Sequence, residues 1–249
     1  MSSDGAENRP AVLMSNSLAA DLTMWDSQAK ALSQDFRVIR YDTRGHGQTE
    51  ATAGDYSLDL LVDDVLALLD TLKIPTVHFI GLSLGGMIGQ LLGARAPDRL
   101  RSLTLCATFA QTSPDLWKQR IATVKQHGLE PVVEPTLERW FTPYFRERHG
   151  DVVNAARAMI RLTSAEGYIG CAAAIRDMNL AGVAEKIATP TLLIAGAEDP
   201  SATPDMMLGL HKRISGSKFA LLPDAAHVLT MEQPQAITEI ISSFLARQS

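Results

Sequence analysis

Short, mostly apolar runs alternate with longer segments of helical periodicity along much of this chain. The apolar runs predict buried strands at residues 11–14, 36–41, 77–80, 100–107, 191–195 and 218–222. Apolar side chains that recur every three or four positions predict helices at residues 21–33, 58–72, 84–96, 204–213 and 226–246. Because this alternation is typical of a parallel sheet covered by helices on both faces, the sequence predicts the α/β class with a mostly parallel sheet.

The alternation stops between residues 111 and 178. This segment shows no convincing strand pattern, and its helical stretches are interrupted by Pro114, Pro131, Pro135, Pro143, Gly150 and Gly167. The pattern predicts a helical cap over residues 111–178, inserted into an α/β core formed by residues 11–110 and 179–249. Residues 1–10 are mostly polar, which predicts a flexible tail.

Composition and charge limit the kinds of molecule that this protein is expected to bind. The net charge is −5 and no basic stripe is visible, so nucleic acid is not an expected partner. No apolar run approaches the roughly 20 residues that span a membrane, and the polar N-terminus lacks the pattern of a signal peptide. Cys106 and Cys171 lie far apart in no metal-binding spacing. We therefore expect a cytoplasmic protein with free, buried thiols and a small-molecule substrate.

The strongest candidate for chemistry is the stretch Gly81-Leu82-Ser83-Leu84-Gly85, between a predicted strand and a predicted helix. Gly-x-Ser-x-Gly is the sequence form of a nucleophile elbow, a sharp strand-to-helix turn that exposes a serine hydroxyl. A β-carbon at Gly81 or Gly85 would clash in such a turn, because it brings backbone segments close together. Taken alone, the motif is equally compatible with a glycine-rich turn that contains an idle serine.

A serine nucleophile needs a base and an acid that orients the base, in the chain order serine, acid, histidine for this elbow. Asp199 follows the predicted strand 191–195, and His227 follows the predicted strand 218–222. Both positions lie at strand carboxyl ends, where ligands bind in open α/β sheets. The alternatives are a turn role for Asp199, Glu198 as the acid, and a capping or packing role for His227. The order of the three residues favours a triad of Ser83, His227 and Asp199.

The proposed chemistry also needs two N–H groups that stabilise an oxyanion. The backbone N–H of Leu84, the residue after the serine, is the first candidate. The second should come from the loop after the first predicted strand, where the N–H of Leu18 is the candidate and an ordinary loop is the alternative. His46, in the run Arg44-Gly45-His46-Gly47, follows the wrong strand for a base, so a structural role is predicted for it and for Arg44.

Several segments together resemble the 3-oxoadipate enol-lactonases, which are α/β-hydrolases of the β-ketoadipate pathway of aromatic breakdown. They are Ser15-Asn16-Ser17-Leu18, residues 40–47, residues 81–86, Arg139-Trp140-Phe141-Thr142, Glu166-Gly167-Tyr168 and Ala202-Thr203-Pro204. The resemblance runs from about residue 11 to the C-terminus. It implies a serine hydrolase without metal or cofactor that opens a small carboxylated enol-lactone. Family members begin with an extra β-hairpin, which residues 1–10 cannot supply, so the sheet is expected to lack its first two strands.

The resemblance further implies that the cap covers the pocket and sets substrate choice. Trp140 is the candidate for a pocket wall, with packing in the core of the cap as the alternative. One cap arginine could bind the substrate carboxylate, but the sequence does not indicate which one. A general carboxylesterase, a perhydrolase or haloperoxidase and a carbon–carbon bond hydrolase are alternatives on the same fold. A non-enzymatic ligand receptor is a further alternative, and the oligomeric state stays open.

Overall fold

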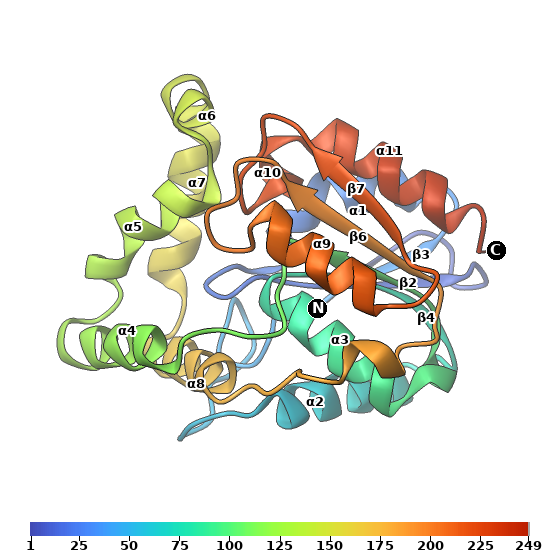
Figure 1. The fold of residues 1–249 in the computed structure, drawn as a ribbon, viewed down its shortest axis with the longest axis horizontal. Coiled ribbons are helices and arrows are strands. Elements are labelled where there is room, and N and C mark those ends of the chain that lie inside the picture. Colours follow the sequence, from blue (N-terminus) through green and yellow to red (C-terminus); the bar gives the residue numbers. More distant parts are fainter. Residues whose placement is uncertain (249) are drawn as a thin grey trace.

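The computed structural model describes residues 1–248 and contains a seven-stranded sheet (Figure 1). The strands are β1 (Ser2–Asp4), β2 (Ala11–Ser15), β3 (Arg37–Arg40), β4 (Val77–Leu82), β5 (Leu100–Cys106), β6 (Thr191–Gly196) and β7 (Lys218–Leu222). They lie in the order β1-β3-β2-β4-β5-β6-β7, with every neighbouring pair parallel except β1 and β3. The carboxyl ends of the parallel strands therefore meet at one edge of the sheet, as the sequence predicts.

Helices cover both faces of this sheet (Figure 1). One layer contains α1 (Asp26–Leu32) and α11 (Pro234–Leu245), and the other contains α2 (Leu58–Thr71), α3 (Leu84–Arg95) and α9 (Pro204–Arg213). The apolar runs are explained by this arrangement, because β2, β4 and β6 are buried along their whole length. Four shorter elements complete the core: η1 (Leu22–Trp25), η2 (Pro97–Arg99), η3 (Ala184–Lys186) and α10 (Leu229–Glu232).

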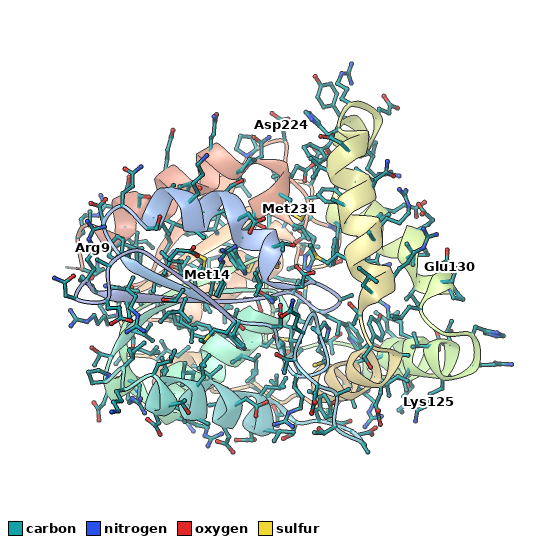
Figure 2. The ribbon with its side chains drawn as sticks, turned by 180° about the vertical axis from the view of Figure 1, so that it is seen from behind. Arg9, Met14, Lys125, Glu130, Asp224 and Met231 are labelled. Atoms are coloured by element: carbon teal, nitrogen blue, oxygen red, sulfur yellow. The ribbon has the colours of Figure 1, made fainter. Side chains whose placement is uncertain are left out.

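The segment between β5 and β6 forms a group of helices beside the sheet (Figure 1). They are α4 (Pro114–His127), α5 (Glu130–Trp140), α6 (Pro143–Arg148), α7 (Gly150–Leu162) and α8 (Ala165–Arg176), and together we call them the helical insertion. Figure 2 shows Lys125 and Glu130 on the outer side of the insertion, away from the sheet strand that contains Met14. Both of these charged residues are exposed.

The N-terminal segment departs from the prediction. Residues 1–10 were expected to form a flexible tail, and the sheet was expected to lack its first two strands, yet Ser2–Asp4 pairs antiparallel with β3. The ladder is formed by backbone groups and therefore does not need apolar side chains. Arg40 of β3 also donates to the Asp4 carboxylate at 2.9 Å. The prediction was wrong for residues 2–4, because an edge strand with one exposed face can be polar.

Cys106 and Cys171 are both free and buried, as predicted. Burial raises the pKa of each thiol well above its usual range, so neither carries thiolate character near neutral pH. Within residues 1–248, no helix combines the length and the apolar character that crossing a membrane requires.

Candidate active site

Ser83 lies in a strained turn between β4 and α3. Its backbone has φ 55° and ψ −110°, a conformation that side-chain-bearing residues rarely adopt and that is characteristic of a nucleophile elbow. The flanking glycines are required sterically. A β-carbon at Gly81 would lie 2.2 Å from the carbonyl oxygen of Gly85, and one at Gly85 would lie 2.2 Å from that of Ser15. The turn is therefore possible only with glycine at both positions.

Asp199 and His227 meet at the same edge of the sheet, after β6 and β7. Nδ1 of His227 lies 2.8 Å from Oδ2 of Asp199, and both side chains are buried. The other Asp199 oxygen accepts the N–H groups of Ser201 at 2.7 Å and Ala202 at 3.0 Å. Burial raises the pKa of the Asp199 carboxyl, but the His227 ring and the two N–H groups outweigh it and hold that pKa below its usual value. Asp199 is thus a carboxylate that can orient the imidazole.

A cavity of about 230 Å³ lies between the sheet edge and the helical insertion, and it brings most of the candidate residues together. Ser83, His227, Leu18 and Trp140 all line it, whereas Asp199 lies behind the imidazole. The indole of Trp140 is almost fully buried and contributes to the cavity wall. Glu198, the alternative acid, is exposed and lines a different hollow at the surface.

The loop after β2 approaches the elbow closely. The N–H of Gly85 donates to the carbonyl oxygen of Asn16 at 3.0 Å, and the Asn16 side chain is held by Tyr41 and Trp25. Within residues 1–248, the backbone N–H groups of Leu18 and Leu84 have no protein acceptor. Two unoccupied donors beside the serine could stabilise an oxyanion.

Two arginines of the helical insertion line the cavity without a carboxylate partner among the described residues. Arg139 donates to the Thr136 hydroxyl at 3.0 Å, and Arg120 lies over the ring of Trp117. Burial, assisted by the charge of Arg120, lowers the pKa of Arg139 to about 10. Two unpaired guanidinium groups in one cavity favour an anionic ligand.

The other arginines of the insertion do not line this cavity. Arg157 and Arg161 form ion pairs with Glu134 and Glu130, and Glu130 lies on the outer surface (Figure 2). The sequence reasoning missed Arg120 altogether. Its position three residues after Trp117 is the only signal that could have suggested it, through the stacking of a guanidinium on an indole.

Glu232 was also missed, and it connects the insertion to the loop that carries His227. One carboxylate oxygen accepts the N–H and the hydroxyl of Thr142 at 2.8 and 2.7 Å, and the other accepts the N–H of Ala226 at 2.7 Å. Beside this link, the N–H of Val228 donates to the carbonyl oxygen of Trp140 at 3.0 Å. Residues on both sides of His227 are therefore tied to the end of α5 and the start of α6.

Comparisons with known proteins agree with the fold. Residues 10–234 match the model of the alpha/beta hydrolase fold family. The 3-oxoadipate enol-lactonase 2 of Acinetobacter baylyi is 36% identical over 244 residues, which cover 98% of this chain and 91% of the relative. The crystal structure of the enol-lactonase from Burkholderia xenovorans LB400 superposes with a TM-score of 0.96 at 40% identity, covering 98% of this chain and 95% of that one.

A thermophilic esterase from Thermogutta terrifontis is more distant. It is 28% identical with a TM-score of 0.94, over 99% of this chain and 92% of that one. The fold and the resemblance that the sequence predicted are both confirmed by these matches. The chain therefore belongs to the α/β-hydrolase family, and within it to the group that contains the 3-oxoadipate enol-lactonases.

Proposed function

We propose that this protein is a serine hydrolase that opens a small enol-lactone bearing a carboxylate, such as 3-oxoadipate enol-lactone. The observation that carries the proposal is the coexistence, in one cavity, of the elbow serine, the histidine and two unpaired arginines. The names of the relatives support the lactone, and the arginines support the carboxylate.

In the proposed reaction, the Ser83 hydroxyl oxygen attacks the ring carbonyl carbon while Nε2 of His227 accepts the hydroxyl proton. The N–H groups of Leu18 and Leu84 stabilise the oxyanion. The bond between the carbonyl carbon and the ring oxygen then breaks, and His227 returns the proton to the departing oxygen. The released enol tautomerises to a ketone, which draws the ring opening forward. Water, deprotonated by His227, finally attacks the acyl-enzyme and frees the acid and Ser83.

Within this proposal, residues 111–178 form a cap that closes the pocket and selects the substrate. Arg139 and Arg120 bind the carboxylate at the cap side of the cavity, and Trp140 forms an apolar wall beside the ring. Because Arg139 is half-buried and forms no ion pair within residues 1–248, a bound anion would relieve an unfavourable desolvated charge. The expected preference is for small anionic lactones, since the cavity volume is modest.

The test compares an enol-lactone that carries a free carboxymethyl group with its methyl ester and with p-nitrophenyl acetate. Arg139→Met and Arg120→Met should each raise the KM for the carboxylated lactone by on the order of tenfold or more and leave the KM for neutral substrates unchanged. Arg157→Met, which removes an arginine that pairs with Glu134 outside the cavity, is the matched control. Equal losses on charged and neutral substrates would exclude the carboxylate site.

Ser83→Ala should lower turnover of every substrate by several orders of magnitude. Turnover close to that of the wild type would exclude the triad. The similarity to an esterase makes a general carboxylesterase the second candidate, and a higher kcat/KM for the neutral ester than for the carboxylated lactone would favour it. A non-enzymatic receptor would show no burst of p-nitrophenol with the activated ester.

A further inference from the structure

The imidazole of His46 is buried beside the loop that carries Leu18. Its Nδ1 lies 3.1 Å from the carbonyl oxygen of Arg44, and its Nε2 lies 3.0 Å from the backbone nitrogen of Ala19. A carbonyl oxygen can only accept, so Nδ1 carries the proton. Nε2 must then be the acceptor for the Ala19 N–H. The two contacts together define one neutral tautomer of a side chain that is 1% exposed.

The residue that His46 holds has an unfavourable backbone conformation. Ala19 has φ 64°, which costs a side-chain-bearing residue about 1–3 kcal/mol. The N–H of Ala20 donates to the carbonyl oxygen of Ser17 at 3.2 Å, so residues 17–20 form a turn with the positive φ at its third position. Glycine or asparagine usually fills that position. The turn therefore needs an additional interaction to persist with alanine.

Leu18 occupies the second position of the same turn. The peptide between Leu18 and Ala19 would have to flip if Ala19 relaxed to a negative φ, and the path of the chain at Leu18 would then change. The hydrogen bond to His46 fixes this peptide, because the Ala19 N–H can reach Nε2 in one orientation only. The position of the Leu18 N–H thus depends on an acceptor outside the cavity lining.

The surroundings of His46 favour its neutral form. Burial lowers the pKa of the imidazole, and the backbone carbonyl of Arg44 and the carboxylates of Asp42 and Asp21 oppose this only in part. The Asp42 carboxylate itself accepts hydrogen bonds from the N–H groups of Leu22 and Gln48. Helix α8 contributes Cys171, whose thiol points to the same Arg44 carbonyl at 3.8 Å.

We propose that His46 is a positioning residue for the oxyanion site: its Nε2 holds the Ala19 N–H and thereby fixes the turn that presents the N–H of Leu18 to the substrate. The inference rests on the proposed function, because it assigns the Leu18 N–H to the oxyanion. It differs from a role as base, since His46 does not line the cavity and accepts a bond from the backbone.

Two substitutions of His46 test the roles of its two ring nitrogens separately. His46→Gln puts an amide oxygen near the place of Nε2 and keeps an acceptor for Ala19. His46→Asn puts an amide nitrogen near the place of Nδ1 and keeps only the donor to Arg44. With p-nitrophenyl acetate, and with active sites counted from the burst, the His46→Asn enzyme should lose roughly 10- to 100-fold in kcat at an unchanged KM. The His46→Gln enzyme should restore kcat to within a few-fold of the wild type.

Equal kcat values for the two variants would overturn the proposal, whether both were active or both impaired. A measurement on the wild type covers the case in which the asparagine variant does not fold. The ¹⁵N spectrum of histidine-labelled protein at pH 7.5 should show His46 protonated at Nδ1 and unprotonated at Nε2, and the reverse tautomer would exclude the proposed bond. If Ser83→Ala were inactive and His46→Asn kept wild-type activity, the proposed hydrolase function would stand. The positioning role of His46 would then be rejected.

Discussion

Nδ1 of His227 lies 2.8 Å from the Asp199 carboxylate, whose second oxygen is fixed by two backbone N–H groups. This carboxylate holds the imidazole with its proton on Nδ1 and leaves Nε2 free to act as a base. In Asp199→Asn, the amide NH₂ would donate to Nδ1 and impose the opposite tautomer. We expect kcat to fall by about 10⁴-fold at an almost unchanged melting temperature, measured by steady-state kinetics and thermal unfolding.

Glu198→Gln provides the control for this substitution. Glu198 precedes Asp199 in the chain, but its side chain is exposed and does not line the cavity. The kcat of the Glu198→Gln enzyme should therefore stay within a few-fold of the wild-type value. A larger loss in Glu198→Gln than in Asp199→Asn would show that the acid has been assigned to the wrong residue.

Substitution of Glu232 should affect both stability and catalysis. The carboxylate accepts bonds from Thr142 and Ala226 with different oxygens, so in Glu232→Gln the amide NH₂ must face at least one of these donors. The loss of one buried acceptor should cost roughly 1–3 kcal/mol of unfolding free energy. It should also lower kcat by on the order of tenfold, because the Ala226 N–H adjoins His227.

The exposed Glu239 on α11 offers a matched control for that experiment. Glu239→Gln should change neither urea unfolding nor kcat beyond experimental error. Full activity in Glu232→Gln, together with the expected loss of stability, would mean that the carboxylate supports the fold without positioning His227.

The close approach of the elbow to the loop after β2 predicts a strong effect for Gly85→Ala. The new β-carbon would lie 2.2 Å from the Ser15 carbonyl oxygen and would push the loop that contains Leu18 away from Ser83. We expect a loss of roughly 2–4 kcal/mol in stability and at least 100-fold in kcat. Gly209→Ala on α9 is the control, since its β-carbon would meet no atom within 4 Å and should stabilise the helix by about 0.5–1 kcal/mol.

The fold and the three triad candidates could be predicted from the sequence because their signals are local. A buried parallel strand is an apolar run, an elbow needs its two glycines, and Asp199 follows the buried strand β6. His227 follows β7, an edge strand that is largely half-buried or exposed but still reads as a short apolar run. The chain order of these elements then fixes the sheet edge at which they meet. No long-range contact had to be known in advance.

The remaining parts of the site depend on contacts between distant segments. Within residues 1–248, Arg120 lacks an ion pair such as Arg157 forms, and the carboxylate that pairs with Arg157 comes from another helix. The role proposed for His46 depends on a backbone group 27 positions away. Pro135 also lies inside α5 instead of breaking it, and Pro131, whose carbonyl the missing N–H would have bonded, is an exposed residue of the first helical turn. Patterns along the chain do not report such contacts.

The burial of His78 on β4 leads to a prediction of how the free energy of unfolding depends on pH. Its side chain is fully buried, with Nδ1 2.8 Å from the Ser102 hydroxyl and Nε2 without a hydrogen-bond partner among residues 1–248. Burial, assisted by the charge of Arg101, lowers the pKa of the imidazole to about 4. Between that value and the ordinary pKa of about 6.5, the unfolded chain binds a proton that the folded protein excludes.

The stability that neutral His78 supports should therefore be complete above about pH 6.5 and decline as the pH falls toward 4. For this residue, the decline between pH 7 and pH 5 is about 2 kcal/mol. In His78→Phe, the difference in unfolding free energy between pH 7 and pH 5 should shrink by that amount. The orphaned Ser102 hydroxyl lowers stability equally at both pH values and cancels in the difference. His127→Gln, at an exposed position, should keep the full decline, and an unchanged decline in His78→Phe would show that other groups cause it.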